Sequence, residues 1–288
     1  MGIRQTGLSP IVKAVLRDIA LFLAIVMLAG ALVRYANVVD RFFIYFPERE
    51  LIQTPADRGL EFEETFFTTG DGVRLHGWYV PGRSDVTLLW LHGNAGNISH
   101  RVDNLYEMHE LLGTNIFIFD YRGYGRSEGS PSEDGTYLDG EAAMEFLSNR
   151  GDTGTKTVLF GRSLGGAVAV EIAVQRKIDA LILESPFTSI QAMAKKHYPF
   201  LPGIGLLVRA KYDSISKIGM VDVPVMVVHG ESDEIAPFEM GKELFEAANE
   251  PKRFYAIQGA GHNDTYLVGG QPYYDALARF LRDSLGEP

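Results

Sequence analysis

The sequence predicts an α/β protein with a mostly parallel eight-stranded sheet and helices on both faces of that sheet. The first observation is a set of short, almost wholly apolar runs that end in glycine and polar residues: "VTLLWLHG", "NIFIFDYRG", "TVLFGRS", "ALILESP", "VPVMVVHG" and "RFYAIQGAGH". Such runs suit parallel strands that are buried on both faces. The second observation is that amphipathic stretches of helical length separate most of them, at about 98–112, 136–150, 163–176, 238–248 and 272–285.

The third observation is a hairpin pattern ahead of these runs. The segments "EFEETFFTT" and "VRLHGWYV" alternate apolar and polar residues, and "GDG" joins them. This arrangement is typical of two antiparallel strands with a tight turn. The sheet is therefore expected to begin antiparallel and to continue parallel.

Composition excludes several classes of function. The chain has 288 residues, a net charge of −10 and no cysteine. The acidic balance argues against a nucleic-acid partner, and the lack of cysteine excludes disulfides, thiolate metal sites and a cysteine nucleophile. The glycine-rich "GNAGN" lacks the lysine of a phosphate-binding loop. No metal and no cofactor is expected.

The N-terminal 40 residues are predicted to form a membrane anchor, and residues 41–288 a catalytic domain. Residues 19–33 carry no charge. Alone they would span about 22 Å, short of a hydrocarbon core of about 30 Å, but flanking apolar residues extend the helix to about 12–36. A cleaved signal peptide, ending near Ala29-Gly30-Ala31, and a buried helix of the globular domain are the alternatives.

The orientation and pairing of this helix follow from its flanks and its small residues. Basic residues are nearly balanced on its two sides, and a short basic tail tends to stay inside. The catalytic domain is therefore expected on the extracytoplasmic side. Ala20, Ala24 and Ala31 fall on one helix face, which suggests a homodimer formed through this segment.

The stretch "GRSLG", residues 161–165, fits a nucleophile elbow. It follows an apolar strand and opens a helix, which is the context that a G-x-S-x-G serine needs. Side chains beside the sharp turn would collide, so Gly161 and Gly165 are expected to relieve crowding around Ser163. Gly166 is expected to let the helix lie close to the sheet. The plain alternative is a flexible turn.

A serine nucleophile needs a base and an acid that orients the base. His262 lies in the loop "GAGHND" after the last strand, and Asp233 lies just past the preceding strand. The order serine, aspartate, histidine is the one that this strand–turn–helix context predicts. The rivals for the acid are Glu231, Glu234, Glu184 and Asp264.

An oxyanion would need backbone N–H donors. Leu164, directly after the serine, supplies the first. The second is expected from the loop "LHGNAGN", from Asn94 in preference to Ala95. The alternative for this loop is a plain glycine-rich turn.

Together, "LHGNAGNISHR", "DYRGYGRSEGSPSEDG", "GRSLGGAVA", "ESPFTS", "HGESDEIAPF" and "GAGHND" resemble the alpha/beta-hydrolase superfamily. Within it they are similar to the bud-emergence-protein-like serine hydrolases, whose members commonly carry an N-terminal membrane helix. The resemblance covers residues 60–285. It implies the alpha/beta-hydrolase fold, a triad of Ser163, Asp233 and His262, and an architectural role for Arg122, Tyr124 and Arg126.

Residues 186–221 lie between the sixth and seventh strands, where the resemblance implies a cap insertion. Their middle, "YPFLPGIGLLV", is apolar but broken by prolines and glycines. It is expected either to line an acyl-chain site that faces lipid or simply to pack on the sheet. The substrate-binding candidates in it are Tyr198, Phe200, Leu201, Leu206 and Leu207.

These features predict a membrane-anchored serine hydrolase that cleaves carboxylic esters through an acyl-enzyme. The expected partners are the lipid bilayer and a small-molecule acyl ester or lipid substrate. A protein or acyl-CoA thioesterase would use the same residues and is the alternative within enzymes. A non-catalytic membrane scaffold with a hydrolase fold is the alternative outside them.

Overall fold

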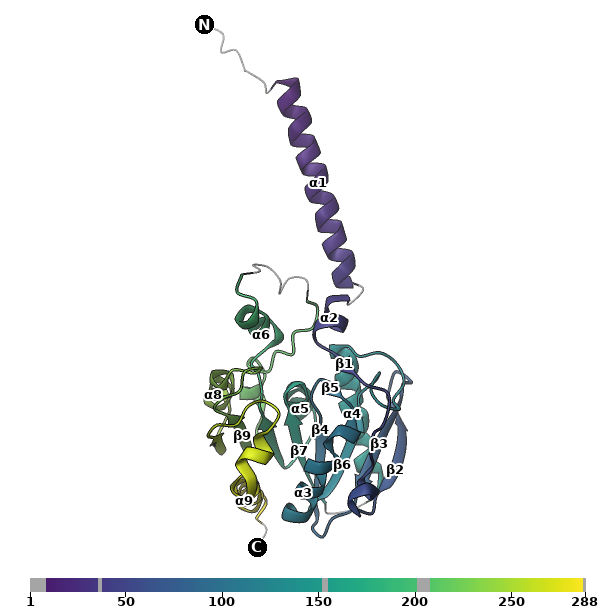
Figure 1. The fold of residues 1–288 in the computed structure, drawn as a ribbon, viewed down its shortest axis with the longest axis vertical. Helices are drawn as coiled ribbons and strands as arrows, with labels where there is room; N and C mark the ends of the chain where they lie inside the picture. The colour runs from purple at the N-terminus through teal and green to yellow at the C-terminus, as the bar shows by residue number, and fades with distance from the viewer. Residues whose placement is uncertain (1–8, 36–37, 152–154, 201–207, 287–288) are drawn as a thin grey trace.

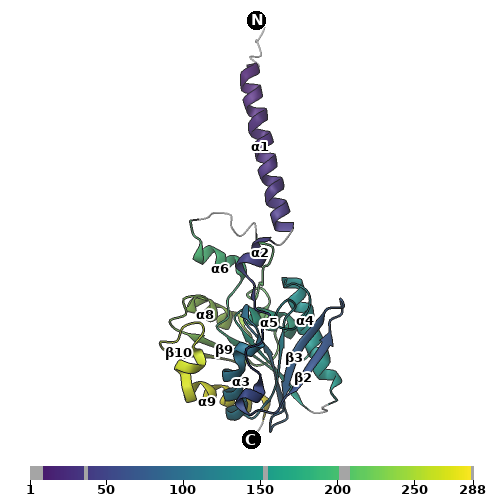
Figure 2. The same ribbon diagram turned by 45° about the vertical axis from the view of Figure 1, so that its right-hand side comes forward.

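A long N-terminal helix projects from a globular body in the computed structural model (Figure 1). The structure describes residues 9–35, 38–151, 155–200 and 208–286. Helix α1 (Pro10–Tyr35) leaves the body on the side that also carries α2 (Val38–Phe43) and α6 (Ile190–His197). The view in Figure 2 shows the same arrangement from a second direction.

The body is built on one eight-stranded sheet in the order β10-β9-β8-β7-β4-β6-β3-β2. Strand β3 is antiparallel to both of its neighbours, and the other neighbours are parallel, as the sequence predicts. The strands are β2 (Glu63–Thr68), β3 (Arg74–Val80), β4 (Val86–Leu91), β6 (Asn115–Asp120), β7 (Lys156–Arg162), β8 (Ala180–Glu184), β9 (Val225–Gly230) and β10 (Lys252–Ile257). Most central strands are buried on both faces, which explains their continuous apolar runs.

Helices cover both faces of the sheet. Helices α3 (Val102–Leu112) and α9 (Thr265–Leu285) pack on one face, and α4 (Glu133–Asn149), α5 (Leu164–Gln175) and α8 (Phe238–Ala247) pack on the other. Short 3-10 turns lie at Pro55–Arg58, Ile98–Arg101 and Ile218–Met220. Two apolar cores result, one on each side of the sheet.

The last helix begins earlier than the predicted residue 272. Helix α9 starts at Thr265 and contains a break at Gly270, whose φ is 50° and ψ −145°. Pro272 follows this break, in the first turn of the second segment, where a missing N–H costs no hydrogen bond. The sequence pattern located only that second segment.

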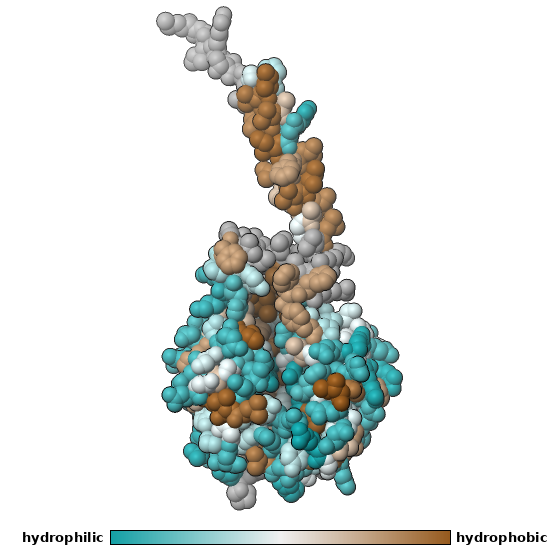
Figure 3. Space-filling model, viewed as in Figure 1, coloured by the Kyte–Doolittle hydropathy of each residue, from teal (hydrophilic) through white to brown (hydrophobic). Residues whose placement is uncertain are grey.

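Helix α1 presents apolar side chains to its surroundings along its whole length (Figure 3). Residues 10–32 are long and apolar enough to cross a membrane, and none of that window is buried against the body. The alternative of a helix buried in the globular domain is therefore wrong. Proximity to the N-terminus leaves both an anchor and a signal sequence consistent with this helix.

Helix α2 follows α1 in the chain, and hydrogen bonds of Asp40 hold it to the globular body. The buried Asp40 carboxylate accepts the backbone N–H groups of Arg209, at 3.0 Å, and Ala210, at 2.9 Å. Downstream, strand β1 (Phe46–Pro47) pairs in parallel with β5 (Ala95–Gly96), in the loop after β4. The segment that follows α1 is thus attached both to the chain at Arg209 and Ala210 and to the loop after β4.

Candidate active site

Ser163 lies at a sharp turn between β7 and α5. Its φ of 52° and ψ of −117° are a strained conformation for a residue with a side chain. A Cβ on Gly161 would lie 2.6 Å from the Gly165 carbonyl oxygen, and one on Gly165 would lie 1.9 Å from the Leu91 carbonyl oxygen. These close approaches agree with the crowding that the sequence predicts around the serine.

The expectation for Gly166 is wrong. A Cβ at Gly166 would meet its nearest atom, the Gly161 carbonyl oxygen, at 3.5 Å, which is ordinary contact. The close approach of α5 to the strands depends on Gly161 and Gly165, because their positions face main-chain atoms that cannot move aside.

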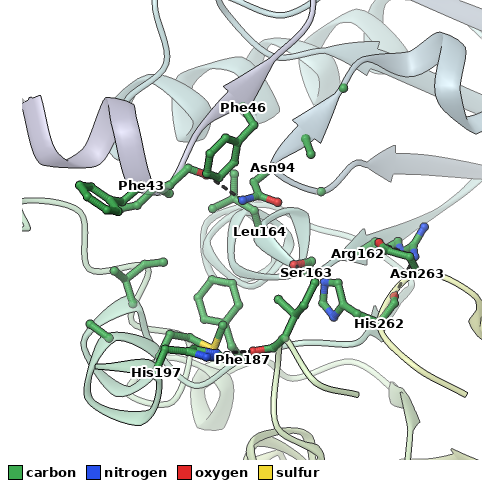
Figure 4. Close-up of a pocket in the computed structure, with 18 of the residues that line it drawn as sticks. Phe43, Phe46, Asn94, Arg162, Ser163, Leu164, Phe187, His197, His262 and Asn263 are labelled. Carbon is green, nitrogen blue, oxygen red and sulfur yellow. Dashed lines mark hydrogen bonds between the residues drawn. The ribbon is translucent and has the colours of Figure 1, made fainter. Parts of the chain in front are cut away.

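The structure brings Ser163, His262 and Asp233 into one hydrogen-bonded chain. Ser163 Oγ lies 3.0 Å from His262 Nε2, and His262 Nδ1 lies 2.8 Å from Asp233 Oδ2. Because a carboxylate only accepts, Nδ1 carries the proton and Nε2 is left to accept from the serine hydroxyl. Figure 4 shows the imidazole beside Ser163, at the side of Arg162 and Asn263.

Asp233 is held by three hydrogen-bond donors and a fourth, longer contact. Besides His262, the N–H groups of Ile235, at 2.9 Å, and Ala236, at 2.8 Å, donate to its Oδ1, and His229 Nε2, which donates to the Ala236 carbonyl oxygen at 2.8 Å, lies 3.2 Å from its Oδ2. Burial alone would raise the pKa of this carboxyl, but hydrogen bonds from His229 and His262 outweigh it and lower the pKa below its usual range. Asp233 is therefore ionised at neutral pH and orients the imidazole. Among the alternative candidates for the acid, Glu184 is bound by other side chains.

Glu184 forms a buried network behind the histidine. Its carboxylate lies 3.1 Å from Arg162 Nε and accepts hydrogen bonds from the Thr265 hydroxyl, at 2.9 Å, and the Tyr273 hydroxyl, at 2.5 Å. Arg162 Nη2 in turn donates to the His262 carbonyl oxygen at 2.8 Å. The network therefore fixes the backbone of the loop that carries the imidazole.

The two predicted oxyanion donors lie beside Ser163. Asn94 and Leu164 both line the cavity at the serine. Their backbone N–H groups have no acceptor within the described ranges. The Asn94 side chain has a different task, since its Nδ2 donates to the Ile44 carbonyl oxygen at 2.8 Å. The Asn94 carbonyl accepts from the Tyr124 hydroxyl at 2.8 Å, consistent with the architectural role expected of Tyr124.

A cavity of about 670 Å³ opens over Ser163. One side of it is apolar and comes from α2, α6 and the segments beside them; its members include Phe43, Ile44, Phe187, Ile190, Met193 and Val208. Its polar lining residues are Glu48, His100, Arg101, Arg162 and Asn263. Figure 4 shows Phe43, Phe187 and His197 on the side away from Arg162 and Asn263.

Of the predicted substrate-binding residues that the structure describes, one lines the cavity. Tyr198 lines the cavity, whereas Phe200 is 74% exposed and is not among the residues that line it. Leu201, Leu206 and Leu207 lie outside the described residues. The sequence analysis did not identify Phe43 and Ile44 as residues of the cavity. The composition of the segment after α1 does not indicate which of its side chains face a serine distant in the sequence.

No group of three or more potential metal ligands occurs in the part of the chain that the structure describes.

Comparisons with known proteins agree with this architecture. The family model described as serine aminopeptidase, S33, matches residues 82–212. The alpha/beta hydrolase domain-containing protein WAV2 of Arabidopsis thaliana is 39% identical over 250 residues, covering 79% of this chain and 81% of WAV2. Protein bem46 of Schizosaccharomyces pombe is 37% identical over 255 residues, covering 83% of each chain. The esterase Pf2001 of Pyrococcus furiosus superposes with a TM-score of 0.73 at 23% identity, over 85% of this chain and 98% of the esterase. The chain belongs to the alpha/beta hydrolases, together with bem46 and WAV2.

Proposed function

We propose that this protein is a membrane-anchored serine hydrolase that cleaves carboxylic esters of amphiphilic acyl chains. The observation that carries the proposal is the unbroken chain of contacts from Ser163 Oγ through His262 to Asp233, at 3.0 Å and 2.8 Å. A serine hydroxyl at neutral pH needs this arrangement to become a nucleophile.

The reaction proceeds in two displacements. His262 Nε2 takes the proton of Ser163 as Oγ attacks the acyl carbonyl, and Asp233 stabilises the imidazolium that forms. The N–H groups of Leu164 and Asn94 donate to the oxyanion of the tetrahedral intermediate. The C–O bond to the leaving alcohol then breaks, and the alcohol takes the proton from His262. Water, deprotonated by His262, attacks the acyl-enzyme and releases the carboxylic acid.

The position of the cavity supports an amphiphilic substrate and a retained anchor. Phe43 and Ile44 line the cavity and follow α1 by only a few residues. Phe42, Phe46 and Tyr198 are exposed and lie on or beside the same segments as the apolar wall. Figure 1 shows α2 and α6 on the side from which α1 projects. An acyl chain leaving a bilayer would meet this wall before it reached Ser163. The area buried along the chain would drive binding at roughly 0.8 kcal/mol per methylene group.

The test is hydrolysis of p-nitrophenyl esters of graded chain length by the full chain in detergent micelles. We expect turnover by the native protein and a loss of at least about a thousandfold in kcat for Ser163→Ala, since the nucleophile is removed. Ser130→Ala, an exposed serine away from the cavity, is the matched control and should keep native rates. Equal rates for native protein and Ser163→Ala would refute the proposal. Turnover of acyl thioesters alone would replace the ester by a thioester, and turnover of aminoacyl anilides alone would replace it by a peptide bond.

The anchor is tested by partition. The full chain should sediment with membranes and resist alkaline carbonate extraction, because a helix of this length buries its apolar faces in lipid. Release of a soluble protein that begins after residue 31 would indicate a cleaved signal instead.

A further inference from the structure

The polar side of the cavity holds two arginines whose surroundings differ. Arg162 is paired within the protein: Nε lies 3.1 Å from the Glu184 carboxylate, and Nη2 donates to the His262 carbonyl oxygen at 2.8 Å. The charge of this guanidinium is therefore balanced by Glu184. Its role is to position the histidine loop.

Arg101 lines the same cavity with most of its donors unused. Its Nη2 donates to the Ala95 carbonyl oxygen at 2.6 Å, and its Nε is buried without a hydrogen-bond partner. Across residues 9–35, 38–151, 155–200 and 208–286, no carboxylate forms an ion pair with it. A guanidinium offers five N–H groups in a planar fork, which is the shape that binds carboxylate and phosphate oxygens in pairs.

Arg101 is a half-buried cation whose buried Nε has no hydrogen-bond partner, an arrangement that is costly and needs a reason. Burial, with repulsion from Arg162 as the second cause, lowers the pKa of Arg101 to about 10, so the group stays charged at neutral pH. Glu48, the acid that lines the cavity, instead lies 3.4 Å from His100 Nε2. Buried charges are normally paired, and a chain with a net charge of −10 has acids enough to have supplied a partner.

We propose that Arg101 binds an anionic group, a phosphate or a carboxylate, on the alcohol portion of the ester. The inference rests on the proposed function and names its substrate class: an apolar acyl chain esterified to an alcohol that carries a negative charge. The acyl chain lies against the wall formed by Phe43, Phe187 and Met193, and the anion lies on the opposite side. Ala95, the partner of Arg101, adjoins the oxyanion donor Asn94, so the charge of the leaving group lies within a few bonds of the scissile ester.

The experiment compares two esters of the same acyl chain, a neutral monoacylglycerol and the corresponding monoacylglycerol phosphate, in micelles with the full chain. The native protein should prefer the phosphate ester. Arg101→Met, which keeps an unbranched stem but removes the charged guanidinium, should lose about 10- to 100-fold in kcat/KM on the phosphate ester, mainly through KM, as expected when a charge-assisted hydrogen bond is removed. On the neutral ester it should change by less than about threefold. Arg101→Lys should recover part of the loss.

Controls separate the anion site from loop shape and from catalysis. Arg83→Met removes the same charge from an exposed surface position and should leave both esters unaffected. Equal losses on the two esters in Arg101→Met would overturn the proposal, since they would indicate that Arg101 only shapes the oxyanion loop. A native protein without preference for the phosphate ester would overturn it as well.

Binding without turnover distinguishes this proposal from the proposed function. In the Ser163→Ala chain, the phosphate ester should bind at least tenfold more tightly than the neutral one, and Arg101→Met in that background should abolish the difference. If this holds while the native protein hydrolyses neither ester, the anion site stands and the esterase does not. Inorganic phosphate alone should compete weakly; competition as strong as that of the ester would reassign the site to free phosphate and overturn the inference of an ester headgroup.

Discussion

Protonation of His92 should contribute to the pH dependence of the stability of this protein. His92 is fully buried at the end of β4, where its Nδ1 donates to the Gly93 carbonyl oxygen at 2.6 Å. Its ring packs against Tyr121 and Tyr124, with centroids 4.5 Å and 5.3 Å away, and Nε2 has no partner among the described residues. A second proton would have to reside on that buried nitrogen.

The size of the effect follows from the pKa. Burial lowers the pKa of His92 from 6.5 to about 4. Between these values the unfolded chain binds a proton at this imidazole and the folded protein does not, so the free energy of unfolding falls as pH falls through this window. The full difference corresponds to about 3 kcal/mol, and most of it is lost by pH 4.5.

The assay is urea unfolding of the full chain in detergent micelles between pH 7 and pH 4.5, for the native protein and His92→Phe. The variant keeps an aromatic ring between Tyr121 and Tyr124 but cannot take a proton. Its free energy of unfolding should fall by about 2–3 kcal/mol less than that of the native protein over this range. Other titrating groups contribute equally to both and cancel in the difference. Parallel pH profiles would refute the reasoning, whatever the stability of the variant at pH 7.

Further predictions concern the glycines beside Ser163, the buried network of Glu184 and the hydrogen bonds of Asp40. Gly165→Ala should abolish stable folding or cost about 3 kcal/mol or more in the free energy of unfolding, because its Cβ would lie 1.9 Å from a main-chain oxygen, whereas Gly166→Ala should stay within about 1 kcal/mol of native; equal effects in urea unfolding would contradict the packing. Glu184→Gln leaves the Arg162 guanidinium without its carboxylate, so the free energy of unfolding should fall by about 3–5 kcal/mol, and a change below 1 kcal/mol would argue against the ion pair. Asp40→Asn removes one of two acceptors for buried backbone N–H groups and should lower the free energy of unfolding by about 1–3 kcal/mol; an unaltered urea midpoint would show that the tie is unimportant.

The sequence pattern was sufficient to predict those features that depend on interactions between residues close in the chain or on burial of a whole strand. The parallel strands could be predicted because strands covered on both faces are almost wholly apolar, as β4, β8 and β9 are. The turn at Ser163 was predictable because side chains beside it would collide with residues close in sequence and with the neighbouring strand. Only glycine avoids these collisions. The positions of Asp233 and His262 followed from their places after consecutive strands, whose carboxyl ends meet at one edge of the sheet.

The sequence by itself therefore determined the sheet, its helices, the apolar N-terminal helix and the residues that meet at Ser163. Only the tertiary structure decided what surrounds them: His229 as a second imidazole on Asp233, Arg162 fastened between Glu184 and the His262 carbonyl, and Phe43 in the cavity wall. These contacts join residues far apart in the chain, so no periodicity or spacing encodes them. The same holds for Arg101: only the folded structure shows that its buried Nε has no hydrogen-bond partner among the described residues.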